Sequence, residues 1–238
     1  IMVKLRILNK LGAKMIFVVA NEKGGSGKTT LSINLANYLA RENKITLIDA
    51  DPQKSTEVFS NNRSDSELAP LFSNIFKTGS ALKDEIDIQK KQNDHLVIDT
   101  GGRDSKEMRI AMIKADYLII PTIPSQLDVA VLEKMLEIFE LAKESNTELK
   151  ALIVLNKISP NPFLSKDIDE LRNFINDIIK ENNLQDVFIL NSMIYERRAF
   201  KKSFESGQTL EEFCQSKNDK AILDFDNLFK EIISIIKQ

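Results

Sequence analysis

A glycine-rich stretch at residues 21–30, with the sequence NEKGGSGKTT, constrains the fold of this chain more than any other segment. It follows an apolar run at 15–20 that is typical of a buried strand. After it, Leu31, Leu35 and Leu39 recur at helical spacing. Strand, glycine-rich turn and helix in this order are the context of a phosphate-binding loop. In such a loop, backbone N–H groups and the positive end of a helix converge on one anion.

The residues of this stretch predict how a nucleotide would be held. The glycines allow the backbone to wrap closely around phosphates, and Lys28 is expected to reach the β- and γ-phosphates. The hydroxyl group of Thr29 is expected to hold Mg²⁺. The expected nucleotide-binding residues of the loop are Gly24, Gly25, Ser26, Gly27, Lys28, Thr29 and Thr30.

One position departs from the ordinary phosphate-loop pattern. Glu22 stands where that pattern has glycine, and a second lysine, Lys23, opens the loop. This arrangement resembles the deviant Walker A motif of the ParA/MinD family of ATPases. The resemblance, which covers residues 15–207, implies ATP and Mg²⁺ as cofactors and catalytic roles for Lys23 and Lys28. In that family, the lysine at the position of Lys23 crosses a dimer interface to the partner's nucleotide.

The same resemblance implies the fold, an α/β P-loop domain with a doubly wound, mainly parallel sheet and helices on both faces. A length of 238 residues suits one such domain at 15–238, preceded by a lead-in at 1–14 of unknown role. The subgroup that the chain most resembles is that of the small ParA partition ATPases, which lack an N-terminal DNA-binding domain.

Composition argues against several other classes of protein. The single cysteine, Cys214, excludes an internal disulfide, argues against the iron–sulfur members of the superfamily and favours a cytoplasmic protein. The longest apolar runs are too short to span a bilayer. The net charge of −2 gives no sign that the chain as a whole binds nucleic acid, so any contact with DNA is expected from a local basic patch.

Two further strands are expected to bring carboxylates to the same site. A strand at 44–49 ends in Asp49, with Asp51 two residues further on, and a strand at 95–99 ends in Asp99. Ligands of open parallel sheets bind beyond the carboxyl ends of the strands, so these carboxylates are expected around the phosphates. By resemblance to the family's Walker A′ element, Asp51 orients the attacking water and Asp49 belongs to the Mg²⁺ shell. Asp99 matches the Walker B aspartate, which acts on Mg²⁺ through water.

Three other segments complete the predicted site. Residues 53–63 are expected to form a mobile switch segment. The sequence PTIPS at 121–125 resembles an element of the small partition ATPases near the nucleotide and the dimer face, which adds Pro124 to the nucleotide-binding residues. The alternative for this segment is a rigid strand-to-helix turn. Ser125 is expected to cap the helix that follows, at 126–145. At the end of a strand, Asn156 is expected from the resemblance to touch the adenine base.

Four cations lie within two helical turns near the end of the resemblance. They form the basic segment, which consists of Arg197, Arg198, Lys201 and Lys202. It resembles the arginine-rich segment that helps partition ATPases to hold DNA without reading its sequence. The alternative is a solvated basic helix. The amphipathic stretch at 219–238 is expected to pack against the sheet, because its basic flank is thin for a membrane-binding helix.

The resemblance implies slow, Mg²⁺-dependent ATP hydrolysis that drives a dimerisation switch in plasmid or chromosome partition. The partners implied are a second copy of the chain, non-specific DNA on the nucleoid and a centromere-binding ParB-like protein that stimulates hydrolysis. No stable membrane association is expected. Three alternatives stay open, namely a MinD-like membrane-cycling positioning ATPase, a DNA-transfer accessory ATPase and an ATP-dependent metabolic synthetase that shares the loop.

Overall fold

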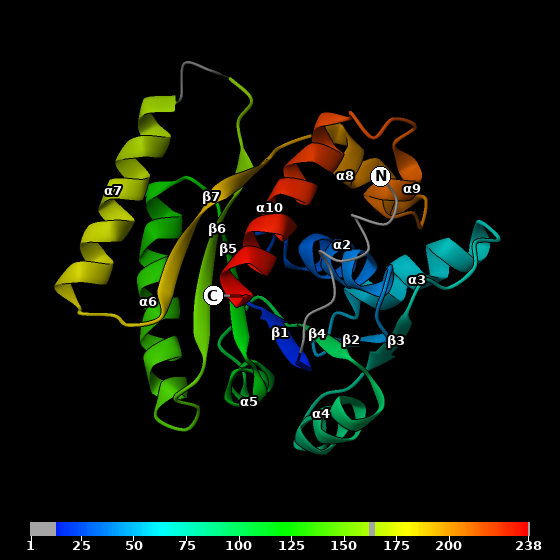
Figure 1. Ribbon diagram of the computed structural model, residues 1–238, viewed down its shortest axis with the longest axis horizontal. Helices are drawn as coiled ribbons and strands as arrows, with labels where there is room; N and C mark the ends of the chain where they lie inside the picture. The colour runs from blue at the N-terminus through cyan, green and yellow to red at the C-terminus, as the bar shows by residue number, and fades with distance from the viewer. Residues whose placement is uncertain (1–12, 162–164, 238) are drawn as a thin grey trace.

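The computed structural model describes residues 13–161 and 165–237, so most of the lead-in expected at 1–14 lies outside the described residues. These residues form a seven-stranded sheet in the order β3-β2-β4-β1-β5-β6-β7, with all neighbouring strands parallel (Figure 1). The strands are β1 (Met15–Val19), β2 (Ile45–Asp49), β3 (Ser73–Phe76), β4 (His95–Asp99), β5 (Tyr117–Thr122), β6 (Lys150–Ile158) and β7 (Val187–Tyr195). The doubly wound parallel sheet expected from the sequence is confirmed.

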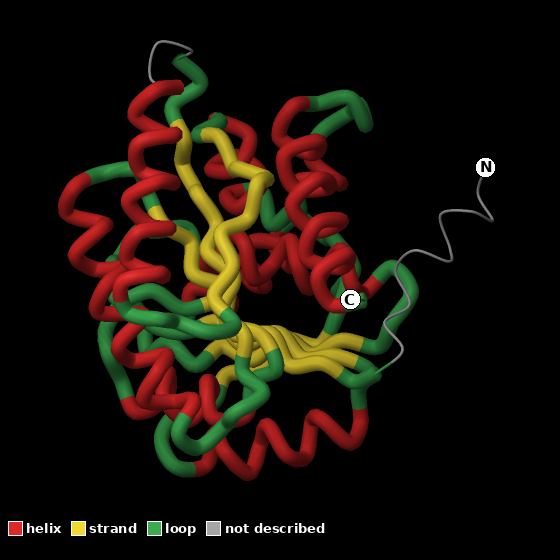
Figure 2. Tube along the Cα trace, turned by 60° about the vertical axis from the view of Figure 1, so that its left-hand side comes forward, coloured by secondary structure: helices red, strands yellow, loops and turns green. Residues whose placement is uncertain are grey.

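Helices lie on both sides of the strands (Figure 2). One apolar core fills the space between the sheet and helices α4 to α7, and a second lies between the sheet and helices α2, α3, α8, α9 and α10. The helices are α2 (Lys28–Ala40), α3 (Ser55–Asp65), α4 (Ala81–Gln92), α5 (Lys106–Lys114), α6 (Gln126–Lys143), α7 (Ser165–Glu181), α8 (Arg198–Glu205), α9 (Leu210–Phe213) and α10 (Lys220–Ile236).

The uniform apolar character of the central strands follows from this layering. Successive side chains of a strand point to opposite faces of the sheet. In β1, Ile16 and Val18 therefore enter the first core, while Phe17 and Val19 enter the second. Because both faces are covered, both sets of side chains must be apolar, as is usual for parallel sheets.

The register of the central strands brings the predicted site residues together. Val19, the last residue of β1, pairs with Asp99 of β4, and Asp99 pairs on its other side with Asp49 of β2. The glycine-rich loop therefore leaves the sheet directly beside two of the carboxylates. This edge of the sheet is where ligands of doubly wound proteins bind.

The segment after β2 contains a helix that was not expected from the sequence, and its role as a mobile switch stays a prediction. Of the residues expected as a mobile switch, 53–63, all from Ser55 onward lie in helix α3. The sequence of α3 gives little helical signal, because it is rich in Ser, Asn and Asp, which are weak helix formers. Contacts with the rest of the fold fix this helix, and Phe59 is buried in the second core.

The edge strand β7 changes register with β6 between Ile189 and Met193. In this interval the backbone N–H groups of Asn191 and Ser192 donate to the two carboxylate oxygens of Glu231, both at 2.7 Å. The guanidinium group of Arg172 donates to the backbone oxygens at 190 and 191, both at 2.9 Å. Side chains from α10 and α7 thus satisfy the irregular part of the edge strand.

Helix α10 packs against the sheet, as its sequence predicted. Phe225, Leu228, Phe229 and Ile232 are buried in the second core, and Phe229 contacts Tyr38 of α2 with ring centroids 5.0 Å apart. Among the described residues, the helices are all too short or too polar to cross a membrane.

Candidate nucleotide site

The glycine-rich loop is fixed to the sheet at its beginning. Asn21 Nδ2 donates to the backbone oxygen of Pro121 at 2.8 Å, and Asn21 Oδ1 accepts from the backbone N–H of Lys23 at 2.7 Å. Asn21 is 1% exposed. No role was predicted for Asn21 from the sequence, although its place between the strand and the first loop lysine is the position from which a side chain can hold both.

The loop ends at Gly27, which precedes the first turn of α2. Its φ of 93° lies in the left-handed region, which favours glycine. A Cβ atom at this position would lie 2.3 Å from Nδ2 of Asn156, so a larger residue would also collide with the side chain that supports the loop. Asn156 Nδ2 donates to the backbone oxygen of Ser26 at 2.6 Å. The predicted nucleotide-binding residue Asn156 therefore also holds the shape of the loop.

The first lysine of the helix turns back across the loop. Lys28 Nζ donates to the backbone oxygen of Lys23 at 3.0 Å, and the residue is only 6% exposed. Burial lowers the pKa of Lys28, while the carboxylates of Asp99 and Asp51 act in the opposite direction. An anion held by the loop would supply the negative charge that a buried ammonium group requires.

Thr29 and Asp99 form the centre of the site. Thr29 Oγ1 donates to Asp99 Oδ2 at 2.7 Å, and Ser32 Oγ donates to Asp99 Oδ1 at 2.9 Å. Burial raises the pKa of Asp99 to about 7, although the hydrogen bond from Thr29 opposes this effect. A buried carboxylate beside a hydroxyl group is a suitable oxygen donor set for Mg²⁺. The structure thus brings the predicted pair Thr29 and Asp99 together.

Both carboxylate oxygens of Asp49 accept hydrogen bonds from the residues that follow it in the chain. Its Oδ1 accepts from the backbone N–H of Asp51 at 2.9 Å, and its Oδ2 accepts from the N–H and the hydroxyl of Thr56 at 2.9 and 2.8 Å. Burial raises the pKa of Asp49, which is 1% exposed. In the structure Asp49 fixes the start of α3 through these hydrogen bonds. Its place in a Mg²⁺ shell stays a prediction.

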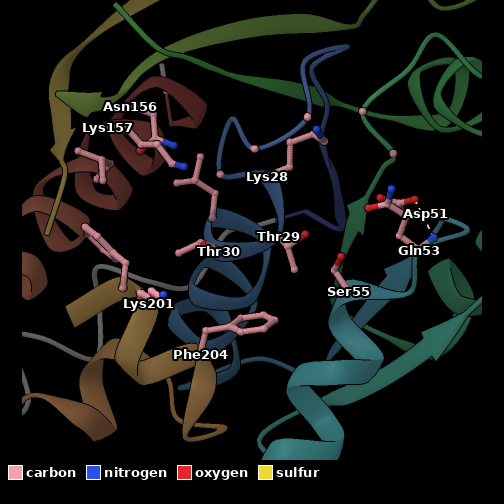
Figure 3. A pocket seen from close by; sticks show the side chains of 18 of the residues that line it. Lys28, Thr29, Thr30, Asp51, Gln53, Ser55, Asn156, Lys157, Lys201 and Phe204 are labelled. Atoms are coloured by element: carbon pink, nitrogen blue, oxygen red, sulfur yellow. Dashed lines mark hydrogen bonds between the residues drawn. The ribbon is translucent and has the colours of Figure 1, made fainter. Parts of the chain in front are cut away.

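Asp51 faces the loop from the other side of a cavity. Its Oδ1 accepts from the backbone N–H of Gln53 at 2.9 Å, and Figure 3 shows both side chains across the cavity from Lys28 and Thr29. Asp51, Lys28 and Thr29 all line this cavity, which has a volume of about 1140 Å³. A carboxylate in this place can accept a hydrogen bond from water near bound phosphates, which is the role that the sequence predicted.

The far end of the same cavity lies between β6 and α8. Asn156 and Lys157 lie side by side there, and Lys201 and Phe204 approach from α8 (Figure 3). The cavity therefore extends from the loop to the basic segment. Pro124 lies outside the lining of this cavity, and its predicted contact with the nucleotide stays a prediction.

Three observations show that the cavity suits a nucleotide and its metal ion. Gly24 and Gly25 line it and have open space where side chains would stand. The buried Ser26 Oγ has no hydrogen-bond partner among the described residues. The volume of the cavity is slightly above the range of about 300–1000 Å³ that is usual for small-molecule sites. The loop backbone with Lys28 can hold phosphates, and Thr29 with Asp99 can hold a divalent cation.

Lys23, the residue that distinguishes this loop, lies outside the lining of the cavity. Its Nζ lies 2.6 Å from Oδ2 of Asp128, a residue of α6 that is 1% exposed. The same carboxylate oxygen accepts a hydrogen bond from Ser125 Oγ, and Ser125 caps α6 as predicted. Asp128 was not predicted from the sequence, because an acidic residue in the first turn of a helix is also a common structural feature.

The four residues of the basic segment differ in their contacts. Arg197 donates to both carboxylate oxygens of Asp224, at 2.7 and 3.1 Å, and its guanidinium group lies over the ring of Tyr195. Arg198, Lys201 and Lys202 are exposed on α8. Arg197 is therefore engaged within the fold, and three of the four predicted DNA-binding residues present their charges to solvent.

The fold and the site together define a P-loop nucleotide-binding protein. A family model described as the CobQ/CobB/MinD/ParA nucleotide binding domain matches residues 17–210. The chain belongs to this family, as the resemblance of its loop had predicted.

Several known proteins are similar over much of the chain. The maintenance of carboxysome distribution protein A of Halothiobacillus neapolitanus is 33% identical over 154 residues, which are 62% of this chain and 68% of that protein. The protein ParA of Rhizobium radiobacter is 25% identical over 198 residues, 82% of this chain and 84% of its own length. The septum site-determining protein MinD of Pyrococcus horikoshii, solved with Mg-ADP, has the same fold, with a TM-score of 0.64, 19% identity and coverage of 94% of this chain and 98% of that one.

Proposed function

We propose that this protein is a Mg²⁺-dependent ATPase that acts as an ATP-driven dimerisation switch in plasmid or chromosome partition. The observation that carries the proposal is the hydrogen bond between Thr29 Oγ1 and Asp99 Oδ2, 2.7 Å long. It lies beside the buried Lys28, in a loop that opens with Lys23. Membership of the ParA/MinD family and the relative named ParA support the partition role.

The chain's own residues divide the work of hydrolysis. The loop backbone and Lys28 bind the triphosphate, Thr29 and Asp99 hold Mg²⁺ with Asp49 nearby, and Asn156 contacts the adenine base. When bound, Mg²⁺ neutralises negative charge on the phosphates. Asp51 accepts a hydrogen bond from the attacking water and orients it toward the γ-phosphate. The ammonium groups of Lys28 and of Lys23 from the other subunit stabilise the charge that develops on the transferred group.

Dimerisation requires a change at Lys23. In the structure this side chain pairs with Asp128 of its own chain, with an Nζ to Oδ2 distance of 2.6 Å. To reach the triphosphate of a second copy, Lys23 must leave this carboxylate. Two ATP molecules then lie between the subunits, and each Lys23 exchanges a carboxylate in its own chain for a phosphate in the other.

The exposed cations of α8 supply the contact with DNA. Arg198, Lys201 and Lys202 bind phosphates without reading bases, so binding weakens steeply with salt. A ParB-like partner stimulates the slow hydrolysis and releases the dimer from DNA. The protein then acts in the cytoplasm, on the nucleoid.

A second candidate concerns the cargo. The relative with 33% identity is named for the distribution of carboxysomes, so a protein body is an alternative cargo to a plasmid or chromosome. The same ATP-dependent dimer and the same DNA contact serve both roles. A membrane-cycling role has less support, because the apolar face of α10 is buried against the sheet.

The proposal is tested by light scattering after size exclusion, with and without ATP and duplex DNA. Wild-type protein should form an ATP-dependent dimer that binds DNA, whereas Lys28→Ala should stay monomeric and bind no nucleotide. Lys114→Ala, which removes a cation that pairs with Asp87 far from the site, is the control. A wild-type protein that binds ATP but remains a monomer would refute the switch and favour a synthetase-like catalyst.

A further inference from the structure

Helix α3 connects the loop that carries Asp51 with the end of the basic helix α8. It begins at Ser55, four residues after Asp51. Its first turn is fixed to β2, because Thr56 donates two hydrogen bonds to Asp49. Asp49 also accepts from the backbone N–H of Asp51 at 2.9 Å, so the Asp51 loop and the start of this helix are held by the same carboxylate.

The other end of α3 is clamped to the segment that follows α8. Arg63, which is 6% exposed, donates from Nη1 and Nη2 to the two carboxylate oxygens of Glu212, both at 2.8 Å. Its Nη1 also donates to the backbone oxygen of Gly207 at 3.0 Å, and its Nε donates to that of Ala69 at 2.5 Å. This paired, charge-assisted geometry fixes both distance and angle between the two elements.

Further contacts along α3 reach α8 itself. Asn62 Nδ2 donates to the backbone oxygen of Phe204 at 3.2 Å, and Ser66 Oγ donates to that of Ser206 at 3.1 Å. The rings of Phe59 and Phe204 lie 5.9 Å apart. These contacts come from both polar and apolar groups, so α3 and the second half of α8 move together.

The close approach of the two segments depends on Gly207. Its φ is +66°, and a Cβ atom at this position would lie 2.2 Å from the backbone nitrogen of Arg63. No other residue type fits without separating the two backbones. The glycine after the basic segment thus allows direct backbone contact with α3.

The opposite end of α8 is attached to α10. Arg197, just before the helix, pairs with Asp224, and Phe200 contacts Phe225 with ring centroids 5.5 Å apart. The basic helix is therefore held at its start by α10 and at its end by α3. A movement of α3 relative to α10 would tilt α8 and redirect its exposed cations.

We propose that Arg63 is a positioning residue that couples the nucleotide site to the basic helix. A change at the Asp51 loop on ATP binding passes through α3 and the Arg63–Glu212 clamp to α8, and so sets the orientation of Arg198, Lys201 and Lys202. This inference rests on the proposed function, and it assigns part of the nucleotide dependence of DNA binding to one pair of residues that lie outside the lining of the cavity.

The test uses Glu212→Gln and Arg63→Lys, which weaken the clamp without removing a large side chain. The affinity for a fluorescent ATP analogue and the affinity for duplex DNA, with and without ATP, are measured at fixed salt. ATP should tighten DNA binding of the wild type by a factor in the usual range for coupled sites, about 5–150. In both variants this factor should fall at least about threefold, while ATP affinity is retained.

The control is Glu211→Gln on the same helix, which removes an exposed ion pair with Arg41. It should leave the ATP dependence unchanged. Unfolding in urea establishes that the variants are folded under the assay conditions. Equal ATP dependence in the wild type and in folded Glu212→Gln would overturn the coupling, and so would an equal loss in the Glu211→Gln control.

A readout without DNA separates this inference from the proposed function. Amide hydrogen exchange of residues 198–205 should change when ATP binds to the wild type, and this response should be lost in Glu212→Gln. If α8 of the wild type responds to ATP but the protein binds no DNA, the proposed DNA contact is refuted and the coupling is supported. An α8 that does not respond in the wild type, although ATP binds, would overturn the coupling. Failure of the wild type to bind ATP would refute the proposed function itself.

Discussion

The ammonium group of Lys23 and the carboxylate of Asp128 are separated by 2.6 Å, although the residues are 105 positions apart in the chain. The side chain of Asp128 is 1% exposed, and that of Lys23 is about one third exposed. The pair joins the start of the glycine-rich loop to the first turn of α6. It holds the distinguishing lysine of the loop within its own subunit.

Weakening this pair should favour the dimer. In Asp128→Asn the neutral amide holds Lys23 less strongly, so less free energy is needed to move the ammonium group to a second subunit. We expect the ATP-dependent dimer to form about three- to tenfold more tightly, since tenfold corresponds to about 1.4 kcal/mol. The dimer dissociation constant, measured by analytical ultracentrifugation with ATP, checks this.

The matched control for Asp128→Asn is Asp87→Asn, which removes an ion pair with Lys114 at 2.7 Å on another part of the surface. It should not alter dimerisation. If Asp128→Asn dimerises no better than the wild type, the intrasubunit pair does not compete with the dimer contact.

Replacement of Asp51 should separate ATP binding from hydrolysis. Asp51 lines the cavity opposite Lys28, and its carboxylate can orient the attacking water. In Asp51→Ala, turnover should fall by about 10² or more, as is usual when a group that acts on the nucleophile is removed. ATP should still bind, so the variant should accumulate as a dimer. Phosphate release and light scattering measure the two effects.

The exposed carboxylate of Asp65, at the end of α3, provides the control for this experiment. Asp65→Ala should hydrolyse ATP at the wild-type rate. Normal turnover in Asp51→Ala would assign the water-orienting role to another residue.

The basic segment should give two distinct results. Replacing Arg198, Lys201 and Lys202 together with alanine should reduce the salt dependence of DNA binding, by about 0.9 in the log–log slope for each phosphate that is no longer neutralised. Arg197→Ala should instead lower the free energy of unfolding by about 1–3 kcal/mol, because it leaves the carboxylate of Asp224 without its ion-pair partner. Fluorescence anisotropy and urea unfolding measure the two quantities.

A charge-matched control lies on α4, on the other face of the sheet. Lys83, Lys90 and Lys91 are exposed there, and their joint replacement by alanine changes the net charge equally. If both triple variants alter the slope to the same degree, net charge and not the α8 surface governs DNA binding.

The single histidine predicts a pH dependence of stability. His95 is 2% exposed, its Nδ1 accepts from the backbone N–H of Met15 at 3.2 Å, and burial lowers its pKa, with Asp94 acting in the opposite direction. The unfolded chain binds a proton near pH 6.5, whereas the folded chain does so only at lower pH. The stability from neutral His95 is therefore fully present above about pH 6.5 and is lost as the pH falls toward the folded pKa.

The comparison of wild type with His95→Gln isolates this effect, since the other titrating groups are common to both. Between about pH 7.5 and 5.5 the wild type should lose stability relative to the variant, with a slope of at most about 1.4 kcal/mol per pH unit for one proton. Urea unfolding across this range measures the difference. Parallel stability curves would show that His95 does not titrate differently on folding.

Local signals account for what could be predicted from the sequence. The glycine-rich loop, the strand ending in Asp99 and the helix after Lys28 are each defined by residues close together in the chain, so the sheet and the Thr29–Asp99 pair followed from them. Contacts between residues that are far apart in the chain could not be predicted in this way. The Arg63–Glu212 clamp joins residues 149 positions apart, and no pattern near either residue indicates the other.

Helix α3 shows the same limit for secondary structure. Its sequence, STEVFSNNRSD, has two adjacent apolar residues and therefore no apolar stripe at helical spacing. Its helical form depends on hydrogen bonds from Thr56 to Asp49 and on the clamp at Arg63. Tertiary contacts override weak local preference in this segment.

The irregular part of β7 has a consequence for higher assembly. A bare edge strand offers backbone groups that another chain can extend as an additional strand. Here Glu231 and Arg172 already occupy backbone donors and acceptors at 190–192. Addition of a strand from another copy at the β7 edge would first have to break these four side-chain hydrogen bonds, so polymers of this protein, if they form along DNA, are not expected to grow by extending the sheet at β7.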